Sequence, residues 1–243
     1  MLTIDFKHID WKNGDRILDM GCGEGRHSIG AAYHYPQVCV VALDLDFDDL
    51  STAKQRHRDF DKASFNHCLY LQGNGYTLPF PDNCFDHIIC SEVLEHVPNY
   101  SAILHELHRV LKPGGSLSVS VPRFWPEKIC WALSTAYHQV EGGHIRIFKS
   151  KELRHAIQKL DFSFRHQHWA HALHVPYWWL RCAFWKQGEN FALSRWYHKL
   201  LVWDMLKRPW LTQTLDTLLN PIIGKSVVMY FDKSKTDTNP TQP

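Results

Sequence analysis

Short β-branched runs alternate with helix-forming segments over most of this 243-residue chain. Strands are predicted at 16–20, 38–44, 68–72, 85–90, 117–121 and 162–168, and helices at 26–35, 47–58, 100–111 and 150–160. Strands and helices in this order are typical of a parallel sheet with helices on both faces, because parallel strands need long crossover connections. The chain is long enough for one sizeable α/β core and short for two independent catalytic domains.

The regular alternation stops near residue 169, and one more strand is predicted at 226–231. Between them, residues 169–224 contain seven of the ten tryptophans and a predicted helix at 193–207. We therefore predict a single domain over residues 1–232 that carries a helical cap inserted at 169–224, before the last strand. Residues 233–243 have the composition of a disordered polar tail.

A glycine-rich turn follows the first predicted strand. After Asp19, glycine occupies every second position, at Gly21, Gly23 and Gly25. Backbone N–H groups and a helix N-terminus converge at such a turn, which suits a nucleotide-like ligand. The spacing differs from the dinucleotide fingerprint GxGxxG, and the charged Arg26 at its third glycine position disfavours NAD. Asp44, at the end of the second strand, is placed to accept hydrogen bonds from two ribose hydroxyls.

Four sequence segments occur in a characteristic order: ILDMGCGEGRHSI, VVALDLD, LPFPDNCFDHIICSEVLEHV and HRVLKPGGSLSVSVP. They resemble the successive motifs of the class I S-adenosylmethionine-dependent methyltransferases of the type-11, small-molecule kind. The resemblance runs from about Arg16 to Val121, and GGHIRIFKSKELRHAIQKLDF extends it to Phe162. It implies an enzyme with a Rossmann-like fold, a seven-stranded, mostly parallel sheet with one antiparallel strand near the end, and S-adenosylmethionine as cofactor.

The same resemblance implies roles for individual residues. Asp19 and the three glycines of the turn would hold the methionine end of the cofactor, and Asp44 its ribose. Cys90 and Ser91, at the end of a strand, would line the sulfonium side. The family commonly has an aspartate for the adenine amino group, where this chain has Asn74 beside Gly75. An amide oxygen can still accept that hydrogen bond, so the departure bears on affinity more than on cofactor identity.

Acidic and histidine side chains gather after the fourth predicted strand, in Glu92-Val93-Leu94-Glu95-His96. With the later His144, they resemble the Glu-x-x-Glu-His and distant His set of magnesium-dependent O-methyltransferases of ubiquinone biosynthesis. Three interpretations stay open at this point. In the first, the four residues Glu92, Glu95, His96 and His144 bind a divalent cation. In the second, His96 or His144 is a metal-free catalytic base. In the third, the histidines are structural hydrogen-bonding groups.

The two parts of the chain differ in charge and in tryptophan content. Residues 1–122 contain 10 basic and 16 acidic side chains, whereas residues 123–225 contain 15 and 7 and all tryptophans except Trp11. Four interpretations of the second part are open. It forms a cap that encloses an apolar substrate or makes a peripheral membrane contact through residues 169–210. Alternatively, it forms an RNA-binding surface or an oligomer contact. Nucleic acid is disfavoured, because the Asp/Asn-Pro-Pro-Tyr and Pro-Cys motifs of nucleobase methyltransferases are missing. Arg123 is expected either to pair with an acidic substrate group or to lie in water.

The predicted function is methyl transfer from S-adenosylmethionine to a small or lipid-like acceptor, at oxygen. The alternatives are a divalent-metal-dependent O-methyltransferase of the quinone type and an inactive, cofactor-binding scaffold protein. No apolar run reaches the roughly 18 to 20 residues of a membrane span, and the N-terminal segment lacks the apolar core of a signal peptide. We therefore expect a cytoplasmic protein, with peripheral membrane contact as one of the alternatives for its second part. Seven cysteines without a CxxC pair indicate reduced thiols.

Overall fold

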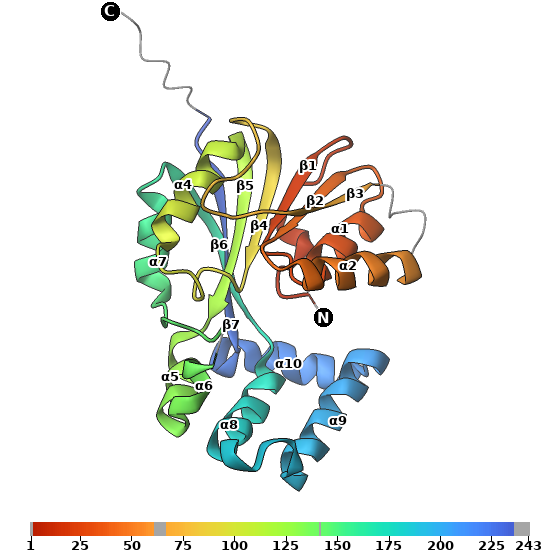
Figure 1. The fold of residues 1–243 in the computed structure, drawn as a ribbon, viewed down its shortest axis with the longest axis vertical. Helices are drawn as coiled ribbons and strands as arrows, with labels where there is room; N and C mark the ends of the chain where they lie inside the picture. Colours follow the sequence, from red (N-terminus) through yellow and green to blue (C-terminus); the bar gives the residue numbers. More distant parts are fainter. Residues whose placement is uncertain (1, 61–66, 141, 236–243) are drawn as a thin grey trace, which may run out of the picture.

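The computed structural model describes residues 2–60, 67–140 and 142–235. Its seven strands form one sheet in the order β3-β2-β1-β4-β5-β7-β6 (Figure 1). Their bounds are Arg16–Met20 (β1), Cys39–Asp44 (β2), Cys68–Gln72 (β3), Phe85–Ser91 (β4), Leu111–Pro122 (β5), Phe162–Ala170 (β6) and Ser226–Lys233 (β7). Only β7 runs against its neighbours, β5 and β6. The predicted class I methyltransferase fold, with a mostly parallel sheet and one antiparallel strand, is confirmed.

Helices cover both faces of the sheet because successive strand residues point to opposite sides. In β1, Leu18 belongs to a core packed by α4 (Tyr100–Val110) and α7 (Ser150–Gln158), whereas Ile17 belongs to a core packed by α1 (Arg26–His34). The remaining helix of the α1 side, α2 (Phe47–Phe60), packs on β2 and β3 (Figure 1). The continuous apolar runs of the central strands are therefore explained by burial on two faces.

The register of the parallel strands brings their carboxyl ends to one edge of the sheet. Met20 of β1 lies opposite Leu43 of β2, and Asp44 of β2 lies opposite Gln72 of β3. On the other side of β1, Asp19 pairs with Ile89 of β4. Ligands of open α/β sheets bind at this edge, so the polar side chains that follow these strands define where to look for a site.

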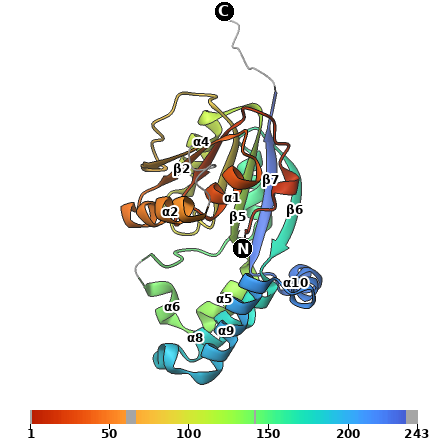
Figure 2. The ribbon, with the colours of Figure 1, turned by 90° about the vertical axis from the view of Figure 1, so that its right-hand side faces the viewer.

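A helical lobe lies beyond the carboxyl ends of β4 and β5 (Figures 1 and 2). It contains α5 (Phe124–Leu133), α6 (Thr135–Gln139), α8 (Val175–Ala183), α9 (Ala192–Lys207) and α10 (Trp210–Ile223). Short 3₁₀ helices are Phe6–His8 (η1), Ala172–His174 (η2) and Trp185–Asn190 (η3). The lobe has a small core of its own, in which α5, α6 and α8 contribute the buried side chains Cys130, Tyr137 and Cys182.

Most predicted boundaries lie within two residues of the observed ones, and the largest difference is at the start of β5. β5 begins at Leu111 rather than at residue 117, because Pro113 and Gly114 form an irregularity within the strand. The pairing with β4 jumps there, from Phe85 opposite Leu111 to His87 opposite Ser116. The last strand extends to Lys233, and most of the predicted tail, residues 236–243, lies outside the described residues.

Two further observations concern membrane-spanning helices and cysteines. No helix among the described residues has the length and apolar character that crossing a bilayer requires. All seven cysteines are free thiols.

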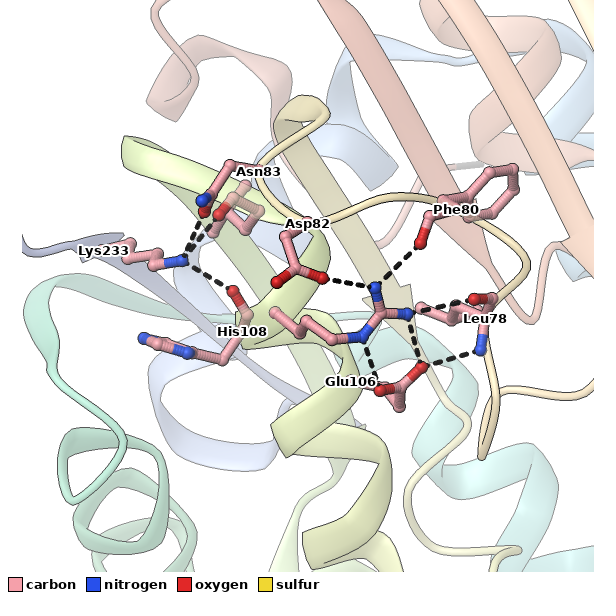
Figure 3. Close-up of polar contacts among 9 residues, drawn as sticks. Leu78, Phe80, Asp82, Asn83, Glu106, His108 and Lys233 are labelled. Atoms are coloured by element: carbon pink, nitrogen blue, oxygen red, sulfur yellow. Dashed lines mark hydrogen bonds and ion pairs between the residues drawn. The ribbon is translucent and has the colours of Figure 1, made fainter.

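An arginine near the end of α4 fixes the loop that connects β3 to β4 (Figure 3). The Arg109 guanidinium donates to the carbonyl oxygens of Leu78 and Phe80, at 3.0 and 2.8 Å, and to Asp82. Glu106 accepts from Arg109 at 2.8 Å and also from the backbone N–H of Leu78 at 2.8 Å. One planar guanidinium thus serves several acceptors and holds the loop on the helix, in addition to the packing of Leu78 and Phe80 on the core.

Lys233 fixes the same end of the helix from the last strand (Figure 3). Its ammonium donates to the carbonyl oxygens of His108 and Leu111 at 2.8 Å each, and to Asn83 Oδ1 at 3.0 Å. The C-terminal carbonyls of α4 thus receive a cation, as the helix dipole favours.

We predict that Arg109→Met lowers the free energy of unfolding by about 1–3 kcal/mol, because the loop carbonyls and Glu106 lose their charged donor. Urea denaturation measures the loss. Arg56→Met is the matched control, since Arg56 pairs with Glu24 on the exposed surface and such pairs contribute about 0–1 kcal/mol. Equal losses for the two variants would contradict the role given to Arg109.

Candidate active site

The glycine-rich turn after β1 approaches the turn after β4 closely. Gly21, Gly23 and Gly25 all have positive φ, at 71°, 50° and 80°. The Gly21 N–H donates to the Leu43 carbonyl at 2.8 Å, which folds the turn back over β2. A Cβ at Gly21 would lie 2.3 Å from Val93 Cγ2, so only glycine lets the two turns pack in this way.

Asp19 is buried at the base of this turn. Ser28 Oγ donates to its Oδ2 at 2.5 Å, and burial raises the pKa of the carboxyl to about 6. A carboxylate buried with one hydroxyl partner lacks a cation to balance its charge. The methionine end of S-adenosylmethionine carries an ammonium group, which has the complementary charge, so Asp19 and the glycine turn fit this part of the cofactor.

The acceptors predicted for the rest of the cofactor follow β2 and β3. Asp44 accepts one backbone N–H on each oxygen, from Gly23 at 2.7 Å and from Asp46 at 2.9 Å. Each carboxylate oxygen keeps a second lone-pair site, so the side chain can still accept from ribose hydroxyls. Asn74 is exposed, and its Oδ1 accepts from Tyr76 N at 3.0 Å with one lone pair left.

Gly75 lies between these acceptors and the end of β1. A Cβ there would lie 3.1 Å from Met20 Sδ and 3.4 Å from Ile103 Cδ1. The backbone after β3 thus approaches the β1 end more closely than a larger residue would allow.

The two residues at the end of β4 have different surroundings. The Cys90 side chain is fully buried in the core beneath the sheet, where burial raises the pKa of its thiol well above the usual range. Only its main chain can therefore line a cofactor cleft. Ser91 is half-buried, and its Oγ lies 2.8 Å from Ser120 Oγ, which donates to Glu92 Oε1 at 2.9 Å.

Three of the four candidate metal ligands converge after β4. One ligand atom each of Glu95, His96 and His144 lies within 4.8 Å of the other two. The rings of His96 and His144 meet edge to face with centroids 4.9 Å apart. Glu92 instead bonds Ser120, and its positive φ of 56° turns the chain toward Glu95. The structure thus brings the two histidines and one of the two acids together.

Backbone contacts hold His144 over this turn although 48 residues separate it from His96. Ile145 N donates to the Glu95 carbonyl at 3.0 Å, and His96 Nδ1 lies 3.3 Å from the Gly143 carbonyl oxygen. The Arg146 guanidinium donates to the carbonyls of Val97 and Pro98, at 2.7 and 2.5 Å. The segment before α7 is therefore fastened to the turn after β4 along its length.

Glu127 of α5 is a site residue that sequence reasoning missed. Its Oε1 lies 2.6 Å from His144 Nδ1 and accepts from Trp131 Nε1 at 3.1 Å, and the Tyr137 hydroxyl lies 3.4 Å from Oε2. Burial alone would raise the pKa of Glu127, but the hydrogen bond and charge of His144, together with Lys225, hold it below the usual value. The one signal in the sequence is a lone acid among apolar and aromatic residues, FWPEKICW.

Glu95 differs from Glu127 in having no partner. Its side chain is fully buried, and neither carboxyl oxygen has a hydrogen bond among the described residues. Burial and the charge of Glu92 raise its pKa well above the usual range. His96 Nε2 lies 3.8 Å from Glu95 Oε1, and burial and the charge of His144 lower the pKa of His96. A carboxyl and an imidazole that both favour their neutral forms thus adjoin the hydrogen-bonded Glu127–His144 pair.

Arg123 is not part of this group. Its guanidinium donates to the carbonyls of Asn220 and Pro221, at 3.3 and 3.0 Å, near the C-terminal end of α10. It also lies over the rings of Trp125 and Trp169. The expectation of a substrate partner or of a water-exposed side chain is replaced by a structural role in the lobe.

Comparisons with known proteins bear on the family and the fold of the chain. Residues 18–119 match the family model described as a methyltransferase domain. The chain is 38% identical over 107 residues to an uncharacterized methyltransferase of Schizosaccharomyces pombe, which covers 43% of this chain and 38% of that protein. It is 34% identical over 128 residues to the demethylmenaquinone methyltransferase of Listeria welshimeri, with 48% and 53% covered. The chain thus spans about half or less of the length of these relatives.

Among solved structures, an S-adenosylmethionine-dependent methyltransferase from Methanosarcina mazei matches 93% of this chain and 95% of its own. The TM-score is 0.59 and the sequence identity 17%, a likeness that shows the fold.

We predict that Gly21→Ala lowers the free energy of unfolding by about 2–5 kcal/mol, through positive-φ strain and the collision with Val93. Urea denaturation measures the loss. Gly142→Ala is the matched control, because Gly142 has a φ of 72° but nothing within 4 Å of its added Cβ. Adding Val93→Ala to Gly21→Ala is expected to restore part of the stability. Equal losses for the two glycine variants would exclude the packing contact.

Proposed function

Since this chain carries a methyltransferase domain of the type-11 family on a class I methyltransferase fold, we propose that it transfers a methyl group from S-adenosylmethionine to the oxygen of an apolar, lipid-like acceptor. The observation that carries the proposal is the His144–Glu127 pair beside His96, at the carboxyl edge of the sheet. That pair adjoins the turn whose Val93 packs on the glycine turn of the cofactor side.

The cofactor side of the site requires little chemistry from the protein. When bound, S-adenosylmethionine supplies a methyl group that is already activated on a cationic sulfur. Asp19 and the glycine turn would hold its methionine end, Asp44 its ribose and Asn74 its adenine, with Ser91 facing the sulfonium side. The remaining tasks of the chain are to align the acceptor, exclude water and remove a proton.

Removal of the hydroxyl proton of the acceptor is assigned to His144. Its Nδ1 faces the ionised Glu127, so Nδ1 carries the hydrogen and Nε2 has the free lone pair. Nε2 then accepts the hydroxyl proton of the acceptor, and Glu127 stabilises the imidazolium that forms. His96, whose pKa is lowered, stays neutral beside it at neutral pH and adds a second polar edge for the acceptor hydroxyl.

Two observations support an apolar acceptor. Aromatic rings continue from His144 into the lobe, because Tyr137 meets His144 with centroids 6.0 Å apart and contacts Trp178 and Trp185 at 5.8 and 5.9 Å. A site with a few polar groups and aromatic walls is typical of apolar ligands. One relative is named for demethylmenaquinone, a quinone. Together they favour an aromatic acceptor, and the proposed transfer to oxygen requires that this acceptor carry a hydroxyl group.

A divalent cation is the second candidate element of the mechanism. Glu95, His96 and His144 lie close enough to share an ion, and the buried Glu95 lacks any other partner. With His144 Nδ1 occupied by Glu127, His144 would bind through Nε2. The cation would polarise the acceptor oxygen and lower the pKa of the acceptor hydroxyl. In that case the cation, rather than His144 as a base, would promote loss of the hydroxyl proton.

We predict that Asp19→Asn weakens S-adenosylmethionine binding while raising the stability of the ligand-free protein. Because the pKa of Asp19 is raised to about 6, its ionisation at pH 7 opposes folding, and its removal should add up to about 3 kcal/mol. In the unmodified protein, affinity should fall as pH drops through about 6, by at most about tenfold per pH unit, as the carboxylate is neutralised. Calorimetric titration at several pH values and urea denaturation measure both effects.

Asp19→Asn should bind weakly with no such pH dependence. No measurable binding of S-adenosylmethionine to the unmodified protein would refute the proposed function. Binding without turnover, over hydroxylated aromatic acceptors with and without an isoprenoid tail, would identify a scaffold protein.

We predict that Glu127→Gln and His144→Ala each lower kcat by about 10²-fold, and that the double variant loses no more than either alone, because the residues act as one unit. Cofactor affinity should stay unchanged. Glu152→Gln, which removes an exposed ion-pair acid, is the control and should keep full activity. Additive losses would contradict the pair. Activity that disappears with EDTA and returns with Mg²⁺ would favour the cation over the metal-free base.

A further inference from the structure

Helix α10 is attached to the protein by its polar face. Its Asp216 accepts from Leu173 N at 3.0 Å and its Asn220 from Ala172 N at 2.9 Å. Gln213 Nε2, one turn earlier, donates to Asp204 Oδ1 at 3.1 Å. These three residues recur at intervals of three and four, so they share one face of the helix.

The opposite face of α10 is apolar and exposed. Leu211, Leu215, Leu218 and Ile222, at intervals of four, three and four residues, form a single stripe. Leu218 and Ile222 are 65% and 63% exposed, and no residue of this helix is buried. An amphipathic helix of a globular protein normally buries its apolar stripe, so α10 has the inverse orientation.

The preceding helix, α9, also carries exposed apolar side chains. Eleven of the 21 large hydrophobic side chains that are exposed among the described residues lie on α9 and α10. They include Trp196, Trp203 and Leu206 of α9, and Trp210 where α10 begins. In Figure 1, α10 lies beside the ends of β6 and β7, and α9 forms the right-hand side of the lobe. A concentration of this size on a small part of the surface marks an interaction site.

The charges of these two helices are one-sided. Arg195, Lys199, Lys207 and Arg208 are exposed. The acids of α9 and α10 face the protein instead, since Asp204 is buried and Asp216 is half-buried and bonded to Leu173 N. Lys199 and Lys207 line a shallow apolar hollow together with Trp203 and Leu206. The exposed surface thus combines tryptophan and leucine with positive charge and presents no negative charge.

We propose that α9 and α10, residues 192–223, bind the interface of an anionic lipid membrane. Exposed tryptophan and leucine enter the boundary between head groups and acyl chains, where amphipathic helices with basic polar residues bind. The lysines and arginines contact the anionic head groups. A symmetric contact with a second copy is disfavoured, because it would bring the same cations of two chains together.

Vesicle sedimentation tests this proposal without any acceptor or turnover. The full chain is mixed with vesicles of phosphatidylcholine alone, or of phosphatidylcholine and phosphatidylglycerol in equal parts. We expect binding to the mixed vesicles, weaker binding to the neutral ones, and release as salt is raised. Leu218→Glu with Ile222→Glu should weaken binding about tenfold or more, since two apolar contacts are lost. Lys199→Glu with Lys207→Glu should remove the preference for the anionic vesicles.

Leu69→Glu is the matched control, because Leu69 of β3 is 58% exposed but far from the lobe in sequence and sheet position. It should bind vesicles as the unmodified chain does. Unchanged S-adenosylmethionine affinity and circular dichroism establish that each variant is folded. Failure to bind either vesicle would overturn the proposal. So would a dimer, detected by light scattering, that dissociates in Leu218→Glu with Ile222→Glu, because α10 would then contact a second copy.

Discussion

The close packing of Gly21 against Val93 is the contact on which the rest of the site depends. It joins the glycine-rich turn after β1, which is proposed to hold the cofactor, to the turn after β4, which carries Glu95 and His96. The β1 and β4 strands are neighbours in the sheet, and their parallel register brings both turns to the same edge. A side chain at Gly21 would separate them. The absence of a Cβ therefore sets the spacing between the proposed cofactor side and the proposed acceptor side, and a direct group transfer depends on such a spacing.

Three buried carboxyls at this edge have different protonation tendencies, and hydrogen bonding accounts for the difference. Asp19 has one hydroxyl partner and a pKa raised to about 6. Glu95 has no partner and a pKa well above the usual range, whereas Glu127, with His144 and Trp131 as donors, has a lowered pKa. Burial disfavours the charge in all three, and only the bonds of Glu127 overcome it. Glu127 is thus suited to hold a histidine, and the other two to receive a cation.

The fold and the glycine turn were predictable from the sequence because their signals are local. A strand, a glycine turn and a helix follow one another directly, and Asp19 to Gly25 lie within that unit. His96 and His144 were also chosen correctly as neighbours, although from a family resemblance. Glu127 was missed because its role arises from tertiary packing: α5 brings it to His144, and no periodicity in the sequence encodes that distance.

The helical lobe shows a second limit of sequence patterns. The hydrophobic spacing of α10 predicts an amphipathic helix, but the pattern does not say which face the protein covers. Hydrogen bonds decide it here, since Asp216 and Asn220 satisfy the backbone N–H groups of Leu173 and Ala172 near the end of β6. Leaving buried donors unpaired would cost more than leaving leucines exposed would, because the leucines can be covered later by another surface.

Arg123 connects that outer surface to the site. It follows directly on β5, whose Ser120 bonds Glu92, and its guanidinium holds the carbonyls of Asn220 and Pro221 in α10. Arg123 is only a few residues from Ser120, so it fixes the orientation of α10 relative to the carboxyl edge of the sheet. If α10 lies on a membrane, the same edge, with His144 and the aromatic rings beside it, is held close to the bilayer. An apolar acceptor could then reach the site from the lipid without its apolar part being fully exposed to water.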